Sequence, residues 1–374
     1  MKYSKVLLGR FFPLVILLCV FNCCSQTEQP DCGTIKPIVV TDTVKWDTDD
    51  PAIWINPDDP TKSLIIGTDK ESDGALYVFD LNGKIIEEKV VRNLKRPNNV
   101  DVEYGLILNG KSVDIAVATE REANKIRIYS LPEMKAVDNG GIEVFEGEEQ
   151  RAPMGISLYK RPTDGAVFAI ISRKEGPLEG YLWQYLLSDD GTGNVKGTKV
   201  RAFGLYSGVK EIESIAVDDQ LGYVYYSDEQ YGIRKYYVDP DVKDANKELG
   251  IIYVMDYLED SEGISIYPVD DKTGYILVSD QSANRFRIYT REGTLADPEE
   301  ETPAQPHNHK LVKIVNASTN NSDGSEVTNM VLNEKFPGGF FVAMSDNKTF
   351  QYYSWKDIAG DDLIISPNGV KQEK

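Results

Sequence analysis

A strand pattern that occurs six times constrains this chain more than any other feature. Each copy has an apolar strand that ends in Ser or Thr plus a charged residue, a short turn, and a second strand that ends in an aromatic residue. In the first copy these strands are Leu64–Asp69 and Leu76–Phe79. The six second strands end about 50 residues or slightly more apart, a period typical of repeat architectures. They end at Phe79, Tyr129, Tyr185, Tyr236, Tyr289 and Tyr353.

Each copy also opens with a short strand after an acidic or Gly-rich turn, as in Asp49–Trp54 and Glu262–Tyr267. Three to four alternating strands per repeat, without amphipathic helices between them, are typical of a propeller blade. We therefore predict an all-β, six-bladed β-propeller over residues 35–360. A polar, Pro-rich insertion at Ala296–His309 lengthens the last spacing. Two β-sandwiches with similar hairpins are the alternative, which the recurring Ser/Thr and charged residue disfavour.

Residues 1–23 have the layout of an export signal. Three basic residues precede the apolar run 11–21, which is too short to span a bilayer. Cys23 follows with no small-residue cleavage site after it, so we predict a bacterial lipoprotein signal. The protein is then expected at the outer membrane, facing the periplasm or the cell surface, with the lipid as its only membrane contact.

Ordinary signal cleavage just downstream is the alternative, which would give a secreted protein with a local disulfide between Cys24 and Cys32. Residues 24–34 are predicted to be a short linker and residues 361–374 a C-terminal tail. No cysteine occurs after Cys32, so a packed core has to hold the domain together. We expect a monomer.

The chain is strongly acidic. It has 60 Asp and Glu residues against 41 Lys and Arg residues, with a formal net charge of −19. Such a surface repels nucleic acid and anionic lipid and attracts cations. We therefore expect no nucleic-acid partner, and we expect metal ions or ligands that arrive with metal.

Acidic residues recur where the first strand of a repeat begins. Because the innermost strands of a propeller start at the same end of its channel, equivalent residues form a ring there. Met154 and Gly155 replace the acids in the third repeat. The acids at these positions are Asp49, Asp50, Asp101, Glu213, Asp260, Glu262, Asp323 and Glu326. Asp228, Glu229 and Gln281 lie where the next strand ends, a position that could face the same end.

Converging carboxylates repel one another, and hard cations with oxygen ligands are the simplest compensation. Calcium is the natural candidate, with several ions expected. Asp and Gly are also ordinary turn formers, so any single acid could be a solvated loop residue. Their recurrence around the ring favours metal binding.

Basic residues follow the repeated Ser or Thr in the first three repeats, at Lys70, Arg121, Arg173 and Lys174. The end of the channel would then have an acidic side and a basic side. This arrangement suits a polyanion that is held by basic side chains on one side and by metal on the other. Exposed turn residues are the alternative. The only histidines, His307 and His309, lie in the insertion. This disfavours a histidine-nucleophile phosphatase, a Ser-His-Asp hydrolase and a His-rich zinc site.

Several segments resemble the β-propeller phytases in sequence and order: Asp49–Trp54, Ile66–Lys70, Asn98–Asp101, Lys174–Gly176 and Glu262–Tyr267. The resemblance covers about residues 35–360. It implies a six-bladed, calcium-dependent phosphomonoesterase that removes phosphates from phytate, myo-inositol hexakisphosphate. It also implies calcium ligands at Asp49, Asp50, Glu213, Asp228 or Glu229, Asp260, Glu262, Gln281 and Asp323. The phosphate-binding cations that it implies are Lys70, Arg121 and Lys174.

Two positions depart from the family pattern. Glu71 stands beside Lys70 where many members carry a second lysine, and Met154 stands where they place a phosphate-contacting tyrosine. Glu71 would oppose a phosphate, and Met154 offers no hydrogen-bond donor. Both departures concern the substrate more than the metal.

We expect hydrolysis of calcium-phytate by a calcium-activated water, without a covalent enzyme intermediate. Glu213, Asp228 and Glu262 are the predicted catalytic ligands. The alternative, favoured by Glu71 and Met154, is a non-catalytic, calcium-stabilised propeller that binds a phosphorylated or sugar ligand at the cell surface. Another calcium-propeller hydrolase, such as a lactonase, is disfavoured by the basic half of the ring.

Overall fold

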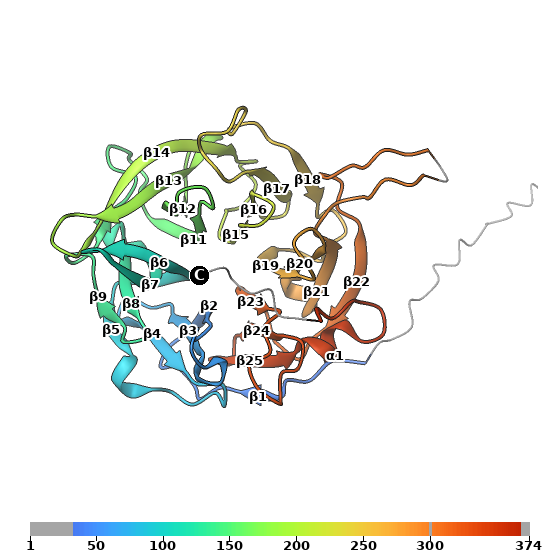
Figure 1. The fold of residues 1–374 in the computed structure, drawn as a ribbon, viewed down its shortest axis with the longest axis horizontal. Coiled ribbons are helices and arrows are strands. Elements are labelled where there is room, and N and C mark those ends of the chain that lie inside the picture. The colour runs from blue at the N-terminus through green and yellow to red at the C-terminus, as the bar shows by residue number, and fades with distance from the viewer. Residues whose placement is uncertain (1–32, 299–300, 368–374) are drawn as a thin grey trace, which may run out of the picture. The chain divides into compact units, whose positions relative to one another are not determined.

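The computed structural model describes residues 33–298 and 301–367. Six antiparallel sheets are arranged around a common axis as a six-bladed β-propeller, which confirms the predicted fold class (Figure 1). The export signal and Cys23, Cys24 and Cys32 lie outside the described residues. Within the described ranges, no helix has the length and apolar character needed to cross a membrane.

The first strand of each sheet is the innermost, because the first strands of neighbouring blades contact one another. Blade 1 consists of β2 (Thr48–Trp54), β3 (Leu64–Asp69), β4 (Gly74–Phe79) and β5 (Val91–Leu94). Blade 2 consists of β6 (Pro97–Leu108), β7 (Lys111–Glu120), β8 (Lys125–Leu131), β9 (Lys135–Ala136) and β10 (Ile142–Glu143). Blade 3 consists of β11 (Pro153–Lys160), β12 (Val167–Arg173), β13 (Glu179–Asp189) and β14 (Val195–Leu205).

The second half of the ring repeats this order. Blade 4 consists of β15 (Ile215–Asp218), β16 (Tyr223–Asp228), β17 (Gly232–Tyr237) and β18 (Gly250–Tyr253). Blade 5 consists of β19 (Ser261–Pro268), β20 (Gly274–Asp280), β21 (Arg285–Thr290) and β22 (Leu311–Asn316). Blade 6 consists of β23 (Ser325–Thr328), β24 (Phe340–Ser345), β25 (Thr349–Ser354) and β1 (Val39–Val40). Short helices occur at η1 (Pro60–Lys62), η2 (Glu87–Lys89), η3 (Arg121–Ala123), η4 (Gln281–Ala283) and α1 (Trp355–Ala359).

The ring closes through a strand from the other end of the chain. β1 is the outermost strand of blade 6 and pairs antiparallel with β25, with Val39 opposite Tyr352. Next to this pairing, the hydroxyl of Thr41 accepts a hydrogen bond of 2.9 Å from the backbone N–H of Phe350. After α1, the chain continues along blade 5, where the N–H of Ile364 donates to the Tyr275 hydroxyl at 2.9 Å.

The core lies between neighbouring blades. Ile115 and Val117 of blade 2 share one buried cluster with Ile156 and Leu158 of blade 3, and the other blade junctions are packed in the same way. Both faces of the inner and second strands are therefore covered. This explains why β3 and β4 are buried along their whole length and why their sequences are nearly continuous apolar runs.

The recurring Ser or Thr ties each of four blades to the next. Its hydroxyl, near the end of the second strand, donates to a backbone carbonyl in the segment that enters the following blade. These bonds, which join blades 2 to 6 in order, are Thr119 to Met154 at 2.6 Å, Ser172 to Ile212 at 2.7 Å, Ser227 to Ser261 at 2.6 Å and Ser279 to Ser322 at 2.8 Å. The repeated Ser or Thr of the sequence pattern is thus the donor of a hydrogen bond between neighbouring blades.

An ion pair links blades 4 and 5 away from these hydroxyls. Arg291, which follows β21, holds both carboxylate oxygens of Asp218 at the end of β15, at 2.5 and 2.6 Å. Both side chains are about 1% exposed. Removing one partner of such a pair leaves a buried charge without compensation.

We expect Arg291→Met to lower the free energy of unfolding by about 3–5 kcal/mol, because Asp218 would remain buried and unpaired. Arg161→Met is the matched control. Arg161 also bridges several aspartates, but its partners Asp164 and Asp241 are half or more exposed, so its loss should cost about 1 kcal/mol or less. Chemical denaturation of both variants measures the difference, and equal losses would contradict this assignment.

The insertion after β21 is anchored by a buried lysine. Lys235 of β17 is about 1% exposed, and its Nζ donates to the carbonyl of Pro306 at 2.8 Å and lies 3.2 Å from His309 Nε2. It also lies over the ring of Tyr223. Burial lowers the pKa of Lys235 to about 7, against the attraction of Asp218, and burial lowers the pKa of His309 to about 4.

This environment predicts a pH-dependent stability. Between pH 7 and about 10 the folded state binds fewer protons at Lys235 than the unfolded state, so its contribution to stability rises with pH. The melting temperature of the wild type relative to Lys235→Met should therefore increase by a few degrees between pH 6 and pH 9. His309 stays neutral across this window. A difference that is constant or falls with pH would rule out a neutral Lys235.

Candidate functional site

Most of the predicted acids come together at one end of the ring, where the inner strands begin. They form two neighbouring groups, each around a lysine. The Lys70 cluster consists of Lys70, Asp49, Glu213 and Asp323. The Lys210 cluster consists of Lys210, Glu229, Asp260 and Glu262.

The Lys70 cluster joins residues from opposite sides of the ring. Lys70 Nζ, directly after β3, lies 2.6 Å from Asp49 Oδ1 in blade 1. It lies 3.3 Å from Asp323 Oδ2 in the segment before β23, and 4.0 Å from Glu213 Oε1 in the segment before β15. Burial disfavours the ammonium, but the attraction of these carboxylates outweighs it and raises the pKa of Lys70. Lys70 is therefore charged and already has partners.

Glu213 connects the two clusters. Its Oε1 accepts a hydrogen bond of 2.5 Å from Asn98 Nδ2, and a carboxylate oxygen of Glu213 lies within 4.8 Å of ligand oxygens of Glu211 and Glu229. Burial alone would raise the pKa of Glu213, but the charges of Lys70 and Arg121 outweigh it and lower the pKa. Glu213 is therefore an ionised carboxylate in the middle of the site.

The Lys210 cluster contains residues from blades 4 and 5 and from the segments that lead into them. Lys210 Nζ, in the segment between β14 and β15, lies 2.6 Å from Asp260 Oδ2, 2.8 Å from Glu229 Oε2 and 3.9 Å from Glu262 Oε1. Burial disfavours its charge, but hydrogen bonds to Asp260 and Glu229 raise the pKa of Lys210. Burial raises the pKa of Glu229 to about 8, although Lys210 opposes this.

Two triads of carboxylates have the spacing that a metal ion requires. One is Glu211, Glu213 and Glu229, and the other is Glu229, Asp260 and Glu262, each with ligand oxygens within 4.8 Å of one another. Glu229 is fully buried, and its Oε1 and Glu262 Oε2 accept no hydrogen bond from any described residue. All of these donors are carboxylate oxygens, the ligand type that hard cations such as calcium prefer.

Five of the side chains at the site share one repeat position, directly after the recurring charged residue. The backbone N–H of each donates, at 2.7 to 3.2 Å, to a carbonyl in the segment that leads into the inner strand of its own blade. Gln281 Nε2 donates to Asp323, and Lys174 pairs with Glu211. The residues at this position are Lys70, Arg121, Lys174, Glu229 and Gln281.

Arg121 lies on the basic side of the site next to Met154. One guanidinium nitrogen contacts the Met154 sulfur, and Nε has no hydrogen-bond acceptor among the described residues. Met154 is completely buried. Met154 therefore lies against the guanidinium, and the buried Nε remains without an acceptor among the described residues.

Five other predicted residues form no ion pair or hydrogen bond with either cluster: Asp50, Asp101, Arg173, Asp228 and Glu326. Asp228 accepts hydrogen bonds from Ser207 and from Arg234 Nε at 2.9 Å, so it holds its own blade together while its neighbour Glu229 reaches the site. Arg173 is 1% exposed, pairs with Glu148 at 3.0 Å and lies over aromatic rings inside blade 3. The reason for both is strand alternation, since successive side chains point to opposite faces.

Asp50 and Asp101 are also placed away from the clusters, farther along the inner strands. Asp50 Oδ2 accepts the Val100 N–H at 3.0 Å, and Asp101 Oδ2 accepts the Leu158 N–H at 2.7 Å. Each acid thus bonds to the inner strand of the next blade. Burial raises the pKa of Asp101 to about 6.

Two charged residues of the site were not predicted. Lys210 and Glu211 directly precede Ile212 and Glu213 in the chain, so two charges beside a predicted ligand were the available signal. The prediction of the ring did not include them because it used the acids at the start of each first strand, and Lys210 and Glu211 precede that position.

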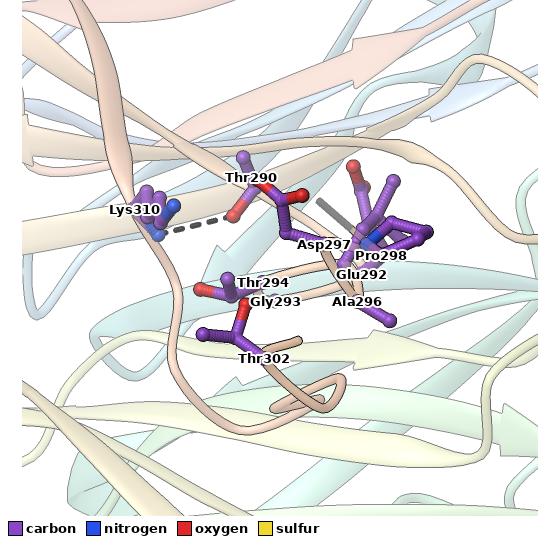
Figure 2. A pocket seen from close by; sticks show the side chains of 10 residues that line it. Thr290, Glu292, Gly293, Thr294, Ala296, Asp297, Pro298, Thr302 and Lys310 are labelled. Carbon is purple, nitrogen blue, oxygen red and sulfur yellow. Dashed lines mark hydrogen bonds between the residues drawn. The ribbon is translucent and has the colours of Figure 1, made fainter. Parts of the chain in front are cut away.

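A surface hollow lies elsewhere, along the hairpin that projects from blade 5 (Figures 1 and 2). Thr290, Glu292, Thr294, Thr302 and Lys310 line it, and the N–H of Lys310 donates to the Thr290 hydroxyl at 3.0 Å. It contains none of the predicted site residues. The hollow is therefore separate from the acidic clusters.

Comparisons with known proteins found matches in both sequence and structure. A phytase family model matches residues 26–361. The 3-phytase of Bacillus subtilis (strain 168) is 31% identical over 334 residues, which cover 83% of this chain and 80% of that protein. A chain in the crystal structure of BBS1N in complex with ARL6DN, soaked with lead, has a TM-score of 0.42 and 11% identity over 78% of this chain and 74% of that one. A likeness of that size carries no information on function.

Proposed function

Because the chain belongs to the phytase family, we propose that it hydrolyses the phosphate monoesters of phytate with calcium ions bound by the two acidic clusters. The observation that carries this proposal is the carboxylate of Glu229. It is fully buried, it is shared by both carboxylate triads, and its Oε1 has no hydrogen-bond donor among the described residues. A bound cation satisfies such an oxygen.

Charge balance supports a metal requirement. Phytate carries several negative charges, and the chain has a formal net charge of −19. Glu211, Glu213, Glu229, Asp260, Glu262 and Asp323 would hold the calcium ions. Bound calcium would supply positive charge to phosphate oxygens and lower the pKa of the attacking water.

The basic side of the site would position the substrate. Lys174 is 44% exposed and Arg121 is partly exposed, so both could bind phosphate groups next to the acidic clusters. The Lys70 side chain is more enclosed, at 15% exposed. Its positive charge would attract a phosphate that lies at the edge of the Lys70 cluster. Ionised Glu213 lies between these cations and the Lys210 cluster, so the attacked phosphate is proposed to lie above Glu213.

The first test is phosphate release from phytate by the full chain, with calcium and with EDTA. We expect release with calcium and at least about a 100-fold loss in EDTA, because the phosphate charge then has no counter-ion at the acidic clusters. Restoring calcium should restore the activity. Equal release in EDTA would contradict calcium dependence, and calcium binding without phosphate release would favour the non-catalytic binder that Glu71 and Met154 suggest.

Substitutions should separate the two sides of the site. Glu262→Gln and Glu213→Gln remove ligand charge and should each lower kcat by about 100-fold or more. Lys174→Ala should mainly raise KM, with about a ten-fold change, because it removes a phosphate contact and leaves the carboxylates in place. Lys196→Ala, at an exposed position of β14, is the control and should change neither constant. Unchanged kcat and KM for Lys174→Ala would exclude a phosphate contact at this position.

A further inference from the structure

The Lys210 ammonium occupies the space between the carboxylates that fit a metal ion. Its two shortest contacts are to Asp260 Oδ2 at 2.6 Å and Glu229 Oε2 at 2.8 Å, and Glu262 Oε1 lies 3.9 Å away. The same three residues form one of the two metal-competent triads. A calcium ion bonds to oxygen at about 2.3–2.6 Å. An ion on these oxygens would therefore compete with Nζ for the same lone pairs.

We propose that Lys210 is a built-in counter-cation that holds the Glu229, Asp260 and Glu262 carboxylates in the metal-free protein and has to withdraw before calcium binds to them. This inference rests on the proposed calcium site and adds a property of this chain: the lysine sets how much calcium the site requires. It assigns a role to Lys210 that is neither metal ligation nor substrate binding.

Lys210 is the most exposed member of its cluster. Its side chain is 34% exposed, whereas those of Glu229, Asp260 and Glu262 are 0, 12 and 6% exposed. It is carried by the segment between β14 and β15, where Gly208 has a φ of 75° and Val209 is 56% exposed. A lysine has a flexible four-carbon stem. The ammonium can therefore turn into solvent while the carboxylates stay in place.

The other cluster provides a contrast within the same molecule. The Lys70 side chain is 15% exposed, and its ammonium contacts Asp49, whose side chain is 1% exposed. Lys70 also follows directly on β3, and its N–H donates to the Asp47 carbonyl at 2.7 Å. Lys70 is thus held by strand geometry, and withdrawal is expected for Lys210 alone of these two lysines.

The arrangement has two thermodynamic consequences. Without metal, Lys210 offsets the repulsion among three buried or nearly buried carboxylates and so stabilises the fold. With metal, the lost lysine contacts are subtracted from the binding free energy, so the affinity is lower than the carboxylates alone would give. Removing the ammonium should change these two quantities in opposite directions.

The test compares wild type and Lys210→Met, in the full chain, by two measurements that need no phytate. The first is the melting temperature in EDTA, and the second is calcium affinity by isothermal titration calorimetry. We expect Lys210→Met to melt several degrees lower in EDTA and to bind calcium about ten-fold more tightly. Lys243→Met removes the same charge from an exposed position in blade 4 and should change neither value.

Two further variants test whether the charge of Lys210 is responsible and guard against misfolding of Lys210→Met. Lys210→Arg retains the positive charge and should stay close to wild type in both measurements. Lys210→Gln keeps a donor for Asp260 and replaces Lys210→Met in the calorimetry if the latter does not fold without calcium. Unchanged or weakened calcium affinity in the uncharged variants would overturn the competition and leave the proposed function standing. Absence of calcium binding in every variant and in wild type would overturn both.

Discussion

Four hydroxyl groups fix the positions of neighbouring blades relative to one another at the end of the ring that carries the site. Thr119, Ser172, Ser227 and Ser279 each donate to a carbonyl of the next blade. Two residues farther along the chain, at the same distance from every hydroxyl, stand the side chains that converge on the acidic clusters. A short hydrogen bond between blades therefore lies beside a side chain of the candidate site at each of these four junctions, so the same repeat organises the ring and the candidate site. The side chains concerned are Arg121, Lys174, Glu229 and Gln281.

Because these side chains converge, the site carries an excess of negative charge. The two clusters bring six acidic side chains around two lysines, Lys70 and Lys210. Partial neutralisation keeps the fold compact without metal, and the residual charge leaves an attraction for divalent cations. The two lysines differ in freedom, since one is held at a strand end and the other stands on a partly exposed connection. The site thus combines a fixed and a replaceable positive charge.

Repetition made the fold and the end of the ring that carries the acids predictable from sequence, because equivalent positions in a propeller lie at equivalent places. It could not decide between adjacent residues at a strand end. Asp228 and Arg173 share one repeat position and turn into their blades, whereas Glu229 and Lys174, one residue later, reach the clusters. Lys210 escaped prediction for a different reason. A long side chain from an irregular connection reaches the site from a position that has no counterpart in the repeat.

The closing strand β1 has a consequence for the order of events during folding. It pairs with β25, so residues more than 300 positions apart have to meet before the last sheet is complete. Contacts of such separation form slowly, and an unpaired strand edge is a site for association with other chains. Because β1 is synthesised first, every partly synthesised chain carries β1 without its partner until β25 has emerged. The sixth blade can therefore be completed only by a chain that extends through Ser354, and the first residues of the domain wait for the last strand.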